Sequence, residues 1–176
     1  MKAFVVDKYA KKGSLRLAEM PTPEPGPTEV LVRIEATAIN LLDSKVRDGE
    51  FKLFLRYRPP FILGHDLAGT VVRVGAQVQG FRAGDQVYGR PRDHRIGTFA
   101  EFIAVDQADL ALKPASLTLE QAASIPLVGL TAWQALVEMG LAGVGLLVAA
   151  LGWWLLALYQ RGAYGNLLAV SLALGV

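Results

Sequence analysis

The stretch FILGHDLAGTVVRVGAQV, residues 61–78, shows most directly what kind of domain this chain forms. It follows the di-proline Pro59-Pro60, and its β-branched and aromatic residues favour a strand. Glycines interrupt it at positions 64, 69 and 75. Glycines inside strands usually mark bulges, barrel corners or places where a ligand comes close to the backbone. This stretch therefore predicts one strand of an irregular, barrel-like β domain.

Short strand signals extend on both sides of this stretch. Five more segments have the composition of short strands: 2–6, 14–19, 29–40, 81–88 and 97–105. The first two are joined through Lys11-Lys12-Gly13, which favours a hairpin. The third alternates apolar and polar residues, as a half-buried strand does. With one or two helical turns expected in residues 41–51, the sequence up to residue 115 predicts a mainly antiparallel β structure.

The pattern becomes helical after residue 115. Thr118 and Gln121 form a T-x-x-Q capping box that opens a short helix, and Pro126 suits the first turn of a second one. Residues 139–160 then contain no charged side chain. A helix of that length spans about 33 Å, enough to cross a hydrocarbon core of about 30 Å. We predict a transmembrane helix here; the alternative is a helix buried in a larger soluble protein.

Charge and composition exclude several classes of protein. All 16 acidic and 17 of the 18 basic side chains lie in residues 1–138, so the net charge of this part gives no reason to expect nucleic-acid binding. The chain has no cysteine, which excludes disulfides, thiolate zinc sites and a cysteine nucleophile. The N-terminus lacks the apolar core of a signal peptide, so we expect a cytoplasmic domain.

The expected organisation is thus a mainly β domain in residues 1–138 and an apolar helical tail in residues 139–176. The tail ends in a second apolar run, 167–176, which is too short to span a bilayer. A domain of about 138 residues offers a single face to one helix, so lipid, detergent or self-association must cover the rest of the tail. The tail is therefore a candidate membrane anchor through residues 139–160.

Several motifs stand in an order and spacing known from one enzyme superfamily. Gly64-His65-Asp66-Leu67-Ala68-Gly69, followed by Gly75 and Val78, is similar to the signature G-H-E-x-x-G-x5-G-x2-V, with Asp in place of Glu. Further motifs occur in the same order: MKAFVV, PTPEPGPTEVLVRI, GDQVYG, GTFAEF and AASIPLVGLTAWQAL. Together they resemble the medium-chain dehydrogenases/reductases, most closely the zinc-independent quinone oxidoreductase-like members. The resemblance implies that residues 1 to about 138 form a GroES-like irregular β-barrel domain.

The resemblance raises the question of a metal site. In zinc-dependent relatives a Cys stands near the position of Asn40 and His65 is a ligand, whereas this chain has no thiolate at all. A tetrahedral zinc site cannot be assembled from His65 and carboxylates at these spacings. We therefore expect no metal. We also expect His65 to be a structural histidine that hydrogen-bonds across its strand, and His94 to be an exposed loop residue.

The resemblance also implies an activity. It implies an NADPH-dependent oxidoreductase that reduces a small-molecule quinone or enone by hydride transfer. It places Asn40, Asp43 and Thr131 at the nicotinamide end of the cleft as cofactor-binding residues. Asn40 is in addition the expected catalytic residue, because its amide can stabilise charge on the reacting carbonyl oxygen. The alternative is that Asn40 and Asp43 only cap a short helix, and that Thr131 bonds within its own helix. Further cleft candidates, with ordinary rim positions as the alternative, are Tyr57, Arg58 and Tyr88.

The resemblance ends near residue 139. In the family a strand and a glycine-rich turn follow here and begin the dinucleotide-binding Rossmann half. Residues 139–176 contain neither feature, so we expect the chain alone to be inactive. The alternatives are a non-catalytic GroES-like module tethered to a membrane, and a truncated or frameshifted fragment.

Overall fold

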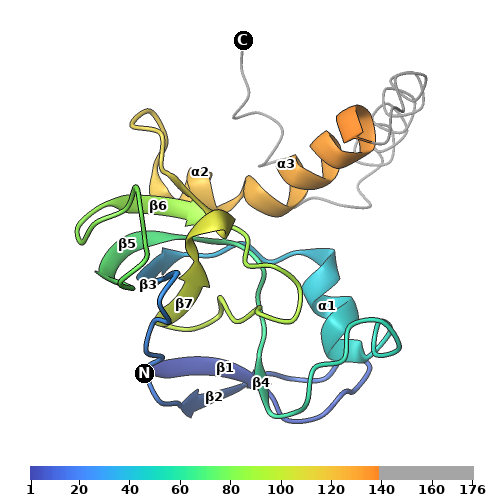
Figure 1. Cartoon of the computed structure of the whole chain (residues 1–176). Coiled ribbons are helices and arrows are strands. Elements are labelled where there is room, and N and C mark those ends of the chain that lie inside the picture. Colours follow the sequence, from blue (N-terminus) through green and yellow to red (C-terminus); the bar gives the residue numbers. More distant parts are fainter. Residues whose placement is uncertain (139–176) are drawn as a thin grey trace. The chain divides into compact units, whose positions relative to one another are not determined.

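Two antiparallel sheets form the framework of residues 1–127 (Figure 1). The computed structural model describes residues 1–138 of the chain. The smaller sheet has the strand order β2-β1-β4, and the larger has the order β7-β3-β5-β6-β8. The strands are β1 (Lys2–Val6), β2 (Arg16–Glu19), β3 (Glu29–Ala36), β4 (Phe61–Ile62), β5 (Leu67–Val74), β6 (Gln86–Gly89), β7 (Phe102–Asp106) and β8 (Leu110–Leu112). An isolated β-bridge between Ala3 and Ala100 links β1 of the small sheet to the segment just before β7.

Helices occupy little of this part of the chain. They are α1 (Leu41–Asp48), the 3-10 turn η1 (Gln107–Asp109), α2 (Leu119–Ala123), α3 (Pro126–Trp133) and the π-helical turn η2 (Gln134–Glu138). The prediction of a mainly β domain with a few helices is confirmed for residues 1–138. So are the hairpin of β1 with β2 and the helix in residues 41–51.

The stretch 61–75 does not form the single strand that its composition predicts. It forms β4 in the small sheet and β5 in the large sheet, with residues 63–66 between them. Gly64 has a φ of +109°, a conformation that residues with a side chain rarely adopt. A Cβ atom there would lie 2.4 Å from the Thr98 hydroxyl oxygen. The glycine therefore marks a corner at which the chain passes from one sheet to the other.

Gly69 and Gly75 mark close approaches between chain segments. A Cβ atom on Gly69 would lie 2.0 Å from the carbonyl oxygen of Arg33 on β3, and one on Gly75 would lie 2.0 Å from the carbonyl oxygen of Gly26. The β3–β5 pairing also shifts register between Ile34 and Ala36. These are the bulges and close approaches that glycines inside a strand indicate, although here the neighbour is the protein's own backbone.

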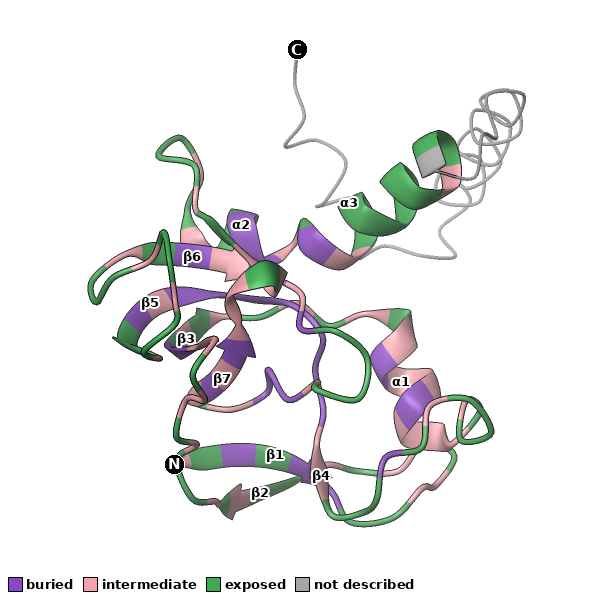
Figure 2. Ribbon diagram, in the orientation of Figure 1, coloured by how far each residue is buried: buried purple, intermediate pink, exposed green. Residues whose placement is uncertain are grey.

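Three groups of buried apolar side chains hold this unit together. Figure 2 shows in purple where buried residues lie along the chain. The first lies in the large sheet and consists of Val30, Val32, Leu67, Val71, Val87, Ile103 and Val105. The second joins β1 to α1 and the loop after it, and consists of Val6, Val46, Tyr57, Leu63 and Phe99. The third packs α2 onto β5 through Ala68, Ala122 and Ala123. The second group anchors α1 and the third anchors β5, and the candidate site described below lies at α1 and next to β5.

The helical signals near the end of the described residues are confirmed. Thr118 and Gln121 cap α2 reciprocally: the Thr118 hydroxyl accepts the Gln121 backbone N–H at 3.2 Å, and the Gln121 side chain accepts the Thr118 N–H at 2.9 Å. Pro126 is the first residue of α3. Residues from Val128 on belong to a second unit. Within residues 1–138 no helix is both long and apolar enough to cross a membrane, and the transmembrane helix predicted for 139–160 lies outside the described residues.

Candidate active site

The first turn of α1 carries two of the predicted site residues. Asn40 is the N-cap of the helix, with an extended backbone, and Asp43 is its third residue. The Asp43 carboxylate accepts the Asn40 backbone N–H at 2.7 Å, and the Asp43 N–H donates to the Asn40 carbonyl at 3.0 Å. Asp43 therefore caps the helix, as one of the two interpretations of the sequence proposes. This cap also fixes the backbone from which the Asn40 side chain projects.

The other oxygen of Asp43 faces His65. The His65 Nδ1 and Asp43 Oδ1 atoms are 2.6 Å apart, and both side chains are buried. Because the carboxylate can only accept, Nδ1 carries the hydrogen. The Nε2 atom of His65 is buried and has no partner among the described residues. His65 is thus a hydrogen-bonded interior histidine, as predicted, but its partner lies on α1 and not across its own strand.

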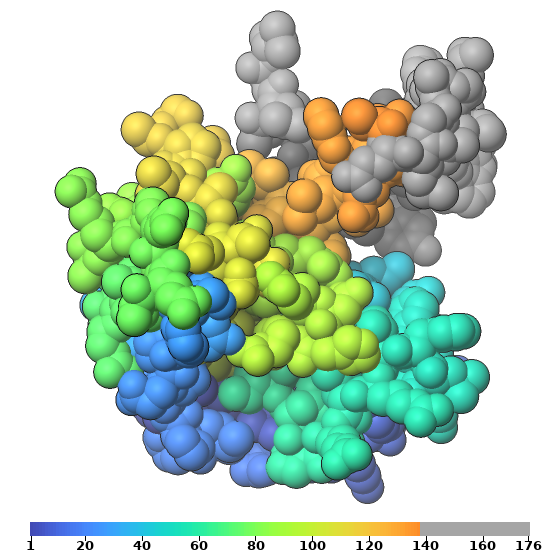
Figure 3. Space-filling view, in the orientation of Figure 1, coloured from blue at the N-terminus to red at the C-terminus, as the bar shows by residue number. Residues whose placement is uncertain are grey.

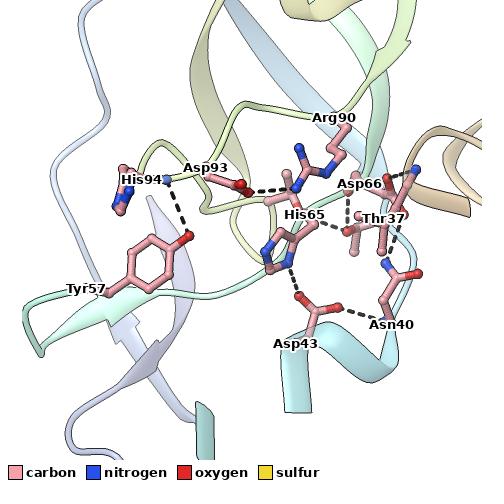
Figure 4. Close-up of polar contacts among 11 residues, drawn as sticks. Thr37, Asn40, Asp43, Tyr57, His65, Asp66, Arg90, Asp93 and His94 are labelled. Atoms are coloured by element: carbon pink, nitrogen blue, oxygen red, sulfur yellow. Dashed lines mark hydrogen bonds and ion pairs between the residues drawn. The ribbon is translucent and has the colours of Figure 1, made fainter. Parts of the chain in front are cut away.

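Asp66 connects three distant segments (Figure 4). Its Oδ2 atom accepts the Asn40 Nδ2–H at 2.9 Å, and its Oδ1 atom accepts the backbone N–H of Leu127 at 2.8 Å. Its carbonyl oxygen accepts the Thr37 hydroxyl at 2.6 Å. Pro126 has no N–H, so Leu127 offers the first backbone donor of α3, and a carboxylate is favourable at that helix end. We call the half-buried Asn40 together with the buried Asp43, His65 and Asp66 the buried polar cluster.

Sequence reasoning did not single out Asp66 as a site residue. In the motif it stands only as the residue that replaces Glu. The signal was present, because a carboxylate in a run as apolar as Leu63 to Val72 is expected to be buried. A buried carboxylate needs hydrogen-bond partners. The sequence does not show that these partners are Asn40 and Leu127, which lie 26 and 61 residues away.

Burial raises the pKa of the Asp66 carboxyl above its ordinary value of 3.8. The hydrogen bonds from Asn40 and from the Leu127 N–H favour the ionised form and oppose this rise. The negative charge of Asp43 adds to the rise, and His65 opposes it. Desolvation is the largest of these effects, so the folded protein holds the Asp66 proton more tightly than the unfolded chain does.

This rise in pKa predicts a dependence of stability on pH. The contribution of Asp66 to the free energy of unfolding is greatest below pH 3.8, where both states are protonated, and falls as the pH rises through the raised pKa. Urea unfolding of the wild type and of Asp66→Asn across this range measures it. We expect the difference between the two unfolding free energies to change with pH in that direction. If this difference does not change with pH, the Asp66 carboxyl has the same pKa in the folded and the unfolded state.

The remaining predicted residues are spread over the structure. Thr131 lies on α3 in the second unit, and its part in cofactor binding stays a prediction. Tyr57 is buried, and its backbone N–H and carbonyl both bond the Tyr9 hydroxyl, so it belongs to the core. Arg58 is exposed, and Tyr88 on β6 packs against the α2 group. His94 is an exposed loop residue, as predicted, and its N–H donates to the Tyr57 hydroxyl at 3.3 Å.

Two further features bear on ligand binding. A mainly apolar pocket of about 680 Å³ lies beside the segment that leads from β3 to Asn40. Its lining includes Phe4, Leu17, Ile34, Thr37, Ile39 and Thr98. Thr37 therefore contacts both the pocket and Asp66. Among residues 1–138 no three histidine, aspartate or glutamate side chains are grouped so that they could hold a metal ion.

The sequence and the fold of this chain are similar to those of known oxidoreductases. The family described as the alcohol dehydrogenase GroES-like domain matches residues 26–115. The chain is 37% identical over 142 residues to the mitochondrial NAD(P)H oxidoreductase RTN4IP1 of Dictyostelium discoideum, and 37% identical over 147 residues to 2-methylene-furan-3-one reductase of Solanum lycopersicum. The structure resembles that of the quinone oxidoreductase from Coxiella burnetii with a TM-score of 0.69 and 32% identity.

These similarities cover most of this chain but less than half of each relative. The aligned region is 77% of this chain and 40% of the Dictyostelium protein, and 80% of this chain and 38% of the tomato enzyme. For the Coxiella structure the shares are 78% and 44%. The chain therefore spans about 40% of the length of the curated relatives that it matches.

Proposed function

The chain belongs to the alcohol dehydrogenase GroES-like domain family, and on that premise we propose that residues 1–138 are the substrate-side half of an NADPH-dependent oxidoreductase. The reaction is the reduction of a quinone or an enone by hydride transfer, without a metal. The relatives named above include an NAD(P)H oxidoreductase, a furanone reductase and a quinone oxidoreductase. They support the reaction class, and the buried polar cluster supports the assignment of residues within it.

The observation that carries the proposal is the hydrogen bond from Asn40 Nδ2 to Asp66 Oδ2, 2.9 Å long. It uses one hydrogen of the amide and fixes the plane of the amide group. An amide has two such hydrogens, so the second can be offered to a ligand. A donor whose direction is fixed before the reaction stabilises developing charge on a carbonyl oxygen without having to reorganise. Asn40 is the residue to which we assign this role.

The carboxylates then act through Asn40. Asp66 holds its side chain, and Asp43 holds its backbone N–H. Both Asp43 oxygens are already engaged, by Asn40 and by His65, and the residue is 1% exposed. The contribution of Asp43 to the site is therefore one of positioning. The second carboxylate oxygen of Asp66 binds the Leu127 N–H, so the orientation of Asn40 is also tied to the start of α3.

The donor set fits the nicotinamide end of NADPH. NADPH supplies the hydride when it is bound. A neutral amide such as Asn40 suits the uncharged carboxamide and carbonyl groups found at that end, whereas the two carboxylates beside it are shielded by their own hydrogen bonds. Thr131 is proposed as a further cofactor contact on the resemblance alone. The pyrophosphate site is proposed to lie on a Rossmann half.

A chimaera tests this function. We join residues 1–138 to the dinucleotide-binding half of the Coxiella burnetii quinone oxidoreductase and follow NADPH oxidation with a quinone. We expect a turnover of roughly 1 per second or faster, whereas the 176-residue chain alone should be inactive. In the chimaera Asn40→Ala should lower kcat by about 10²–10³-fold, as the loss of one preorganised donor does. The KM for NADPH should rise by a smaller factor than kcat falls, because the main proposed role is at the reacting carbonyl.

Ser44→Ala is the matched control. Ser44 lies on the same helix as Asp43 and takes no part in the buried polar cluster, so its removal should leave kcat unchanged. A chimaera that folds and binds NADPH but does not turn over would contradict the proposal. That outcome would favour the non-catalytic module. If Asn40→Ala and Ser44→Ala change kcat equally in an active chimaera, the reaction class is supported but Asn40 is not the catalytic residue.

A further inference from the structure

Six exposed basic side chains gather in two loops that lie against each other. They are Lys8, Lys11 and Lys12 in the β1–β2 connection, and Lys52, Arg56 and Arg58 after α1. None of the six forms a salt bridge with another described residue. We call residues 8–12 and 52–58 the basic loop pair. The rest of residues 1–138 has 11 basic and 16 acidic side chains, so the positive charge is concentrated here.

Hydrogen bonds hold the two loops together. The Tyr9 hydroxyl donates to the Tyr57 carbonyl at 2.6 Å and accepts the Tyr57 N–H at 3.1 Å. The Lys12 backbone N–H donates to the Asp48 carboxylate at 3.1 Å. The acids nearest in sequence pair with cations outside the six: Asp7 with Arg16 at 2.7 Å, Asp48 with Arg47 at 2.8 Å and Glu50 with Lys45 at 3.7 Å. Of the six cations, Lys11 interacts electrostatically with Asp48 without forming a salt bridge. Most of the positive charge of the pair is therefore not cancelled locally.

Two large apolar side chains point outward between these cations. Leu53 is 71% exposed and Phe54 is 80% exposed. The neighbours Phe51, Leu55 and Tyr57 pack into the core group of β1 and α1. The turn is closed by hydrogen bonds from the N–H groups of Phe54 and Leu55 to the Phe51 carbonyl, 2.9 and 2.7 Å long. Figure 3 shows this part of the chain, cyan to teal, at the right-hand edge of the surface.

We propose that the basic loop pair is a docking surface for an anionic lipid membrane. The outward apolar residues enter the boundary between headgroups and acyl chains, and the six cations lie at the level of the anionic headgroups. The charge of the surface is complementary to such a membrane, and the apolar tip distinguishes it from a site for a purely soluble polyanion. The inward packing of Phe51, Leu55 and Tyr57 explains how the tip can stay exposed without unfolding the loop.

Vesicle flotation with the full chain tests the proposal. We compare vesicles of phosphatidylcholine with vesicles that contain about 30% phosphatidylserine. The wild type should bind the anionic vesicles more tightly, by on the order of 100-fold, and added salt should reduce the difference. Binding through the uncharged residues 139–160 does not distinguish the two lipid mixtures, so the preference reports on the basic loop pair.

Two sets of variants separate charge from apolar contact. Lys52→Gln, Arg56→Gln and Arg58→Gln together should abolish the preference for anionic vesicles. The matched control removes three exposed arginines from the large-sheet region, Arg33→Gln, Arg73→Gln and Arg82→Gln, and should keep the preference at the same net charge. Leu53→Ser with Phe54→Ser should weaken binding to anionic vesicles by roughly tenfold while the preference persists. All these side chains are exposed, and circular dichroism checks that each variant is folded.

Three results would overturn the proposal. One is equal binding of the wild type to neutral and anionic vesicles. The second is an equal loss of preference in the control triple variant, which would reflect net charge alone. The third is binding to single-stranded nucleic acid that matches binding to anionic vesicles and is unaffected by Leu53→Ser and Phe54→Ser, which would identify a polyanion site instead.

Discussion

The Asp43→Ala variant is expected to have a free energy of unfolding about 3–5 kcal/mol below that of the wild type. The carboxylate of Asp43 accepts hydrogen bonds from His65 and from the Asn40 backbone, and Asp43 and His65 are buried. Its removal leaves the fully buried His65 Nδ1–H without an acceptor and also removes the acceptor of the half-buried Asn40 N–H. Urea unfolding followed by circular dichroism measures the loss.

Two comparisons show whether this loss comes from the buried pair. Glu50→Ala removes an exposed carboxylate just after the same helix, where the ion pair with Lys45 is 3.7 Å long, and should cost less than about 1 kcal/mol. Asp43→Leu combined with His65→Leu removes both partners and should be less destabilising than Asp43→Ala with His65 left in place. If Asp43→Ala costs no more than Glu50→Ala, the hydrogen bonds of Asp43 contribute little to stability.

The Gly69→Ala variant is expected not to fold, or to lose more than about 4 kcal/mol of stability. A Cβ atom at position 69 would lie 2.0 Å from the carbonyl oxygen of Arg33 and 3.1 Å from the Cα atom of Ile34. Both are backbone atoms of a paired central strand, so neither can move aside without breaking the β3–β5 ladder. Soluble yield and thermal unfolding of the variant measure the effect.

Gly80→Ala is the control for this prediction. Gly80 has a φ of +87°, but no atom lies within 4 Å of a Cβ built there. The substitution should therefore cost only the strain of a left-handed backbone, about 1–2 kcal/mol. An unfolding temperature for Gly69→Ala as high as that for Gly80→Ala would mean that β3 and β5 can separate without loss of the fold.

Local sequence determined those parts of the site that depend on neighbours in the chain. Asn40 and Asp43 are three residues apart, and that spacing suffices to place them in one helical turn and to predict the cap. The same holds for the cap of α2, where Thr118 and Gln121 bond as their spacing predicts. Short-range spacing carries this information because helix geometry is nearly invariant.

Local patterns likewise suffice to predict that residues 1–138 are mainly β, since alternation, turn residues and strand glycines are local properties. Which distant groups meet, in contrast, depends on how the whole chain packs. The stretch 61–75 forms two strands because Gly64 adopts a φ of +109°, which depends on what packs around it. Asp66 meets Asn40 and Leu127, and Tyr9 meets Tyr57, because sheet pairing brings those segments together. Hydrogen bonds between residues far apart depend on packing, and no spacing rule along the chain encodes them.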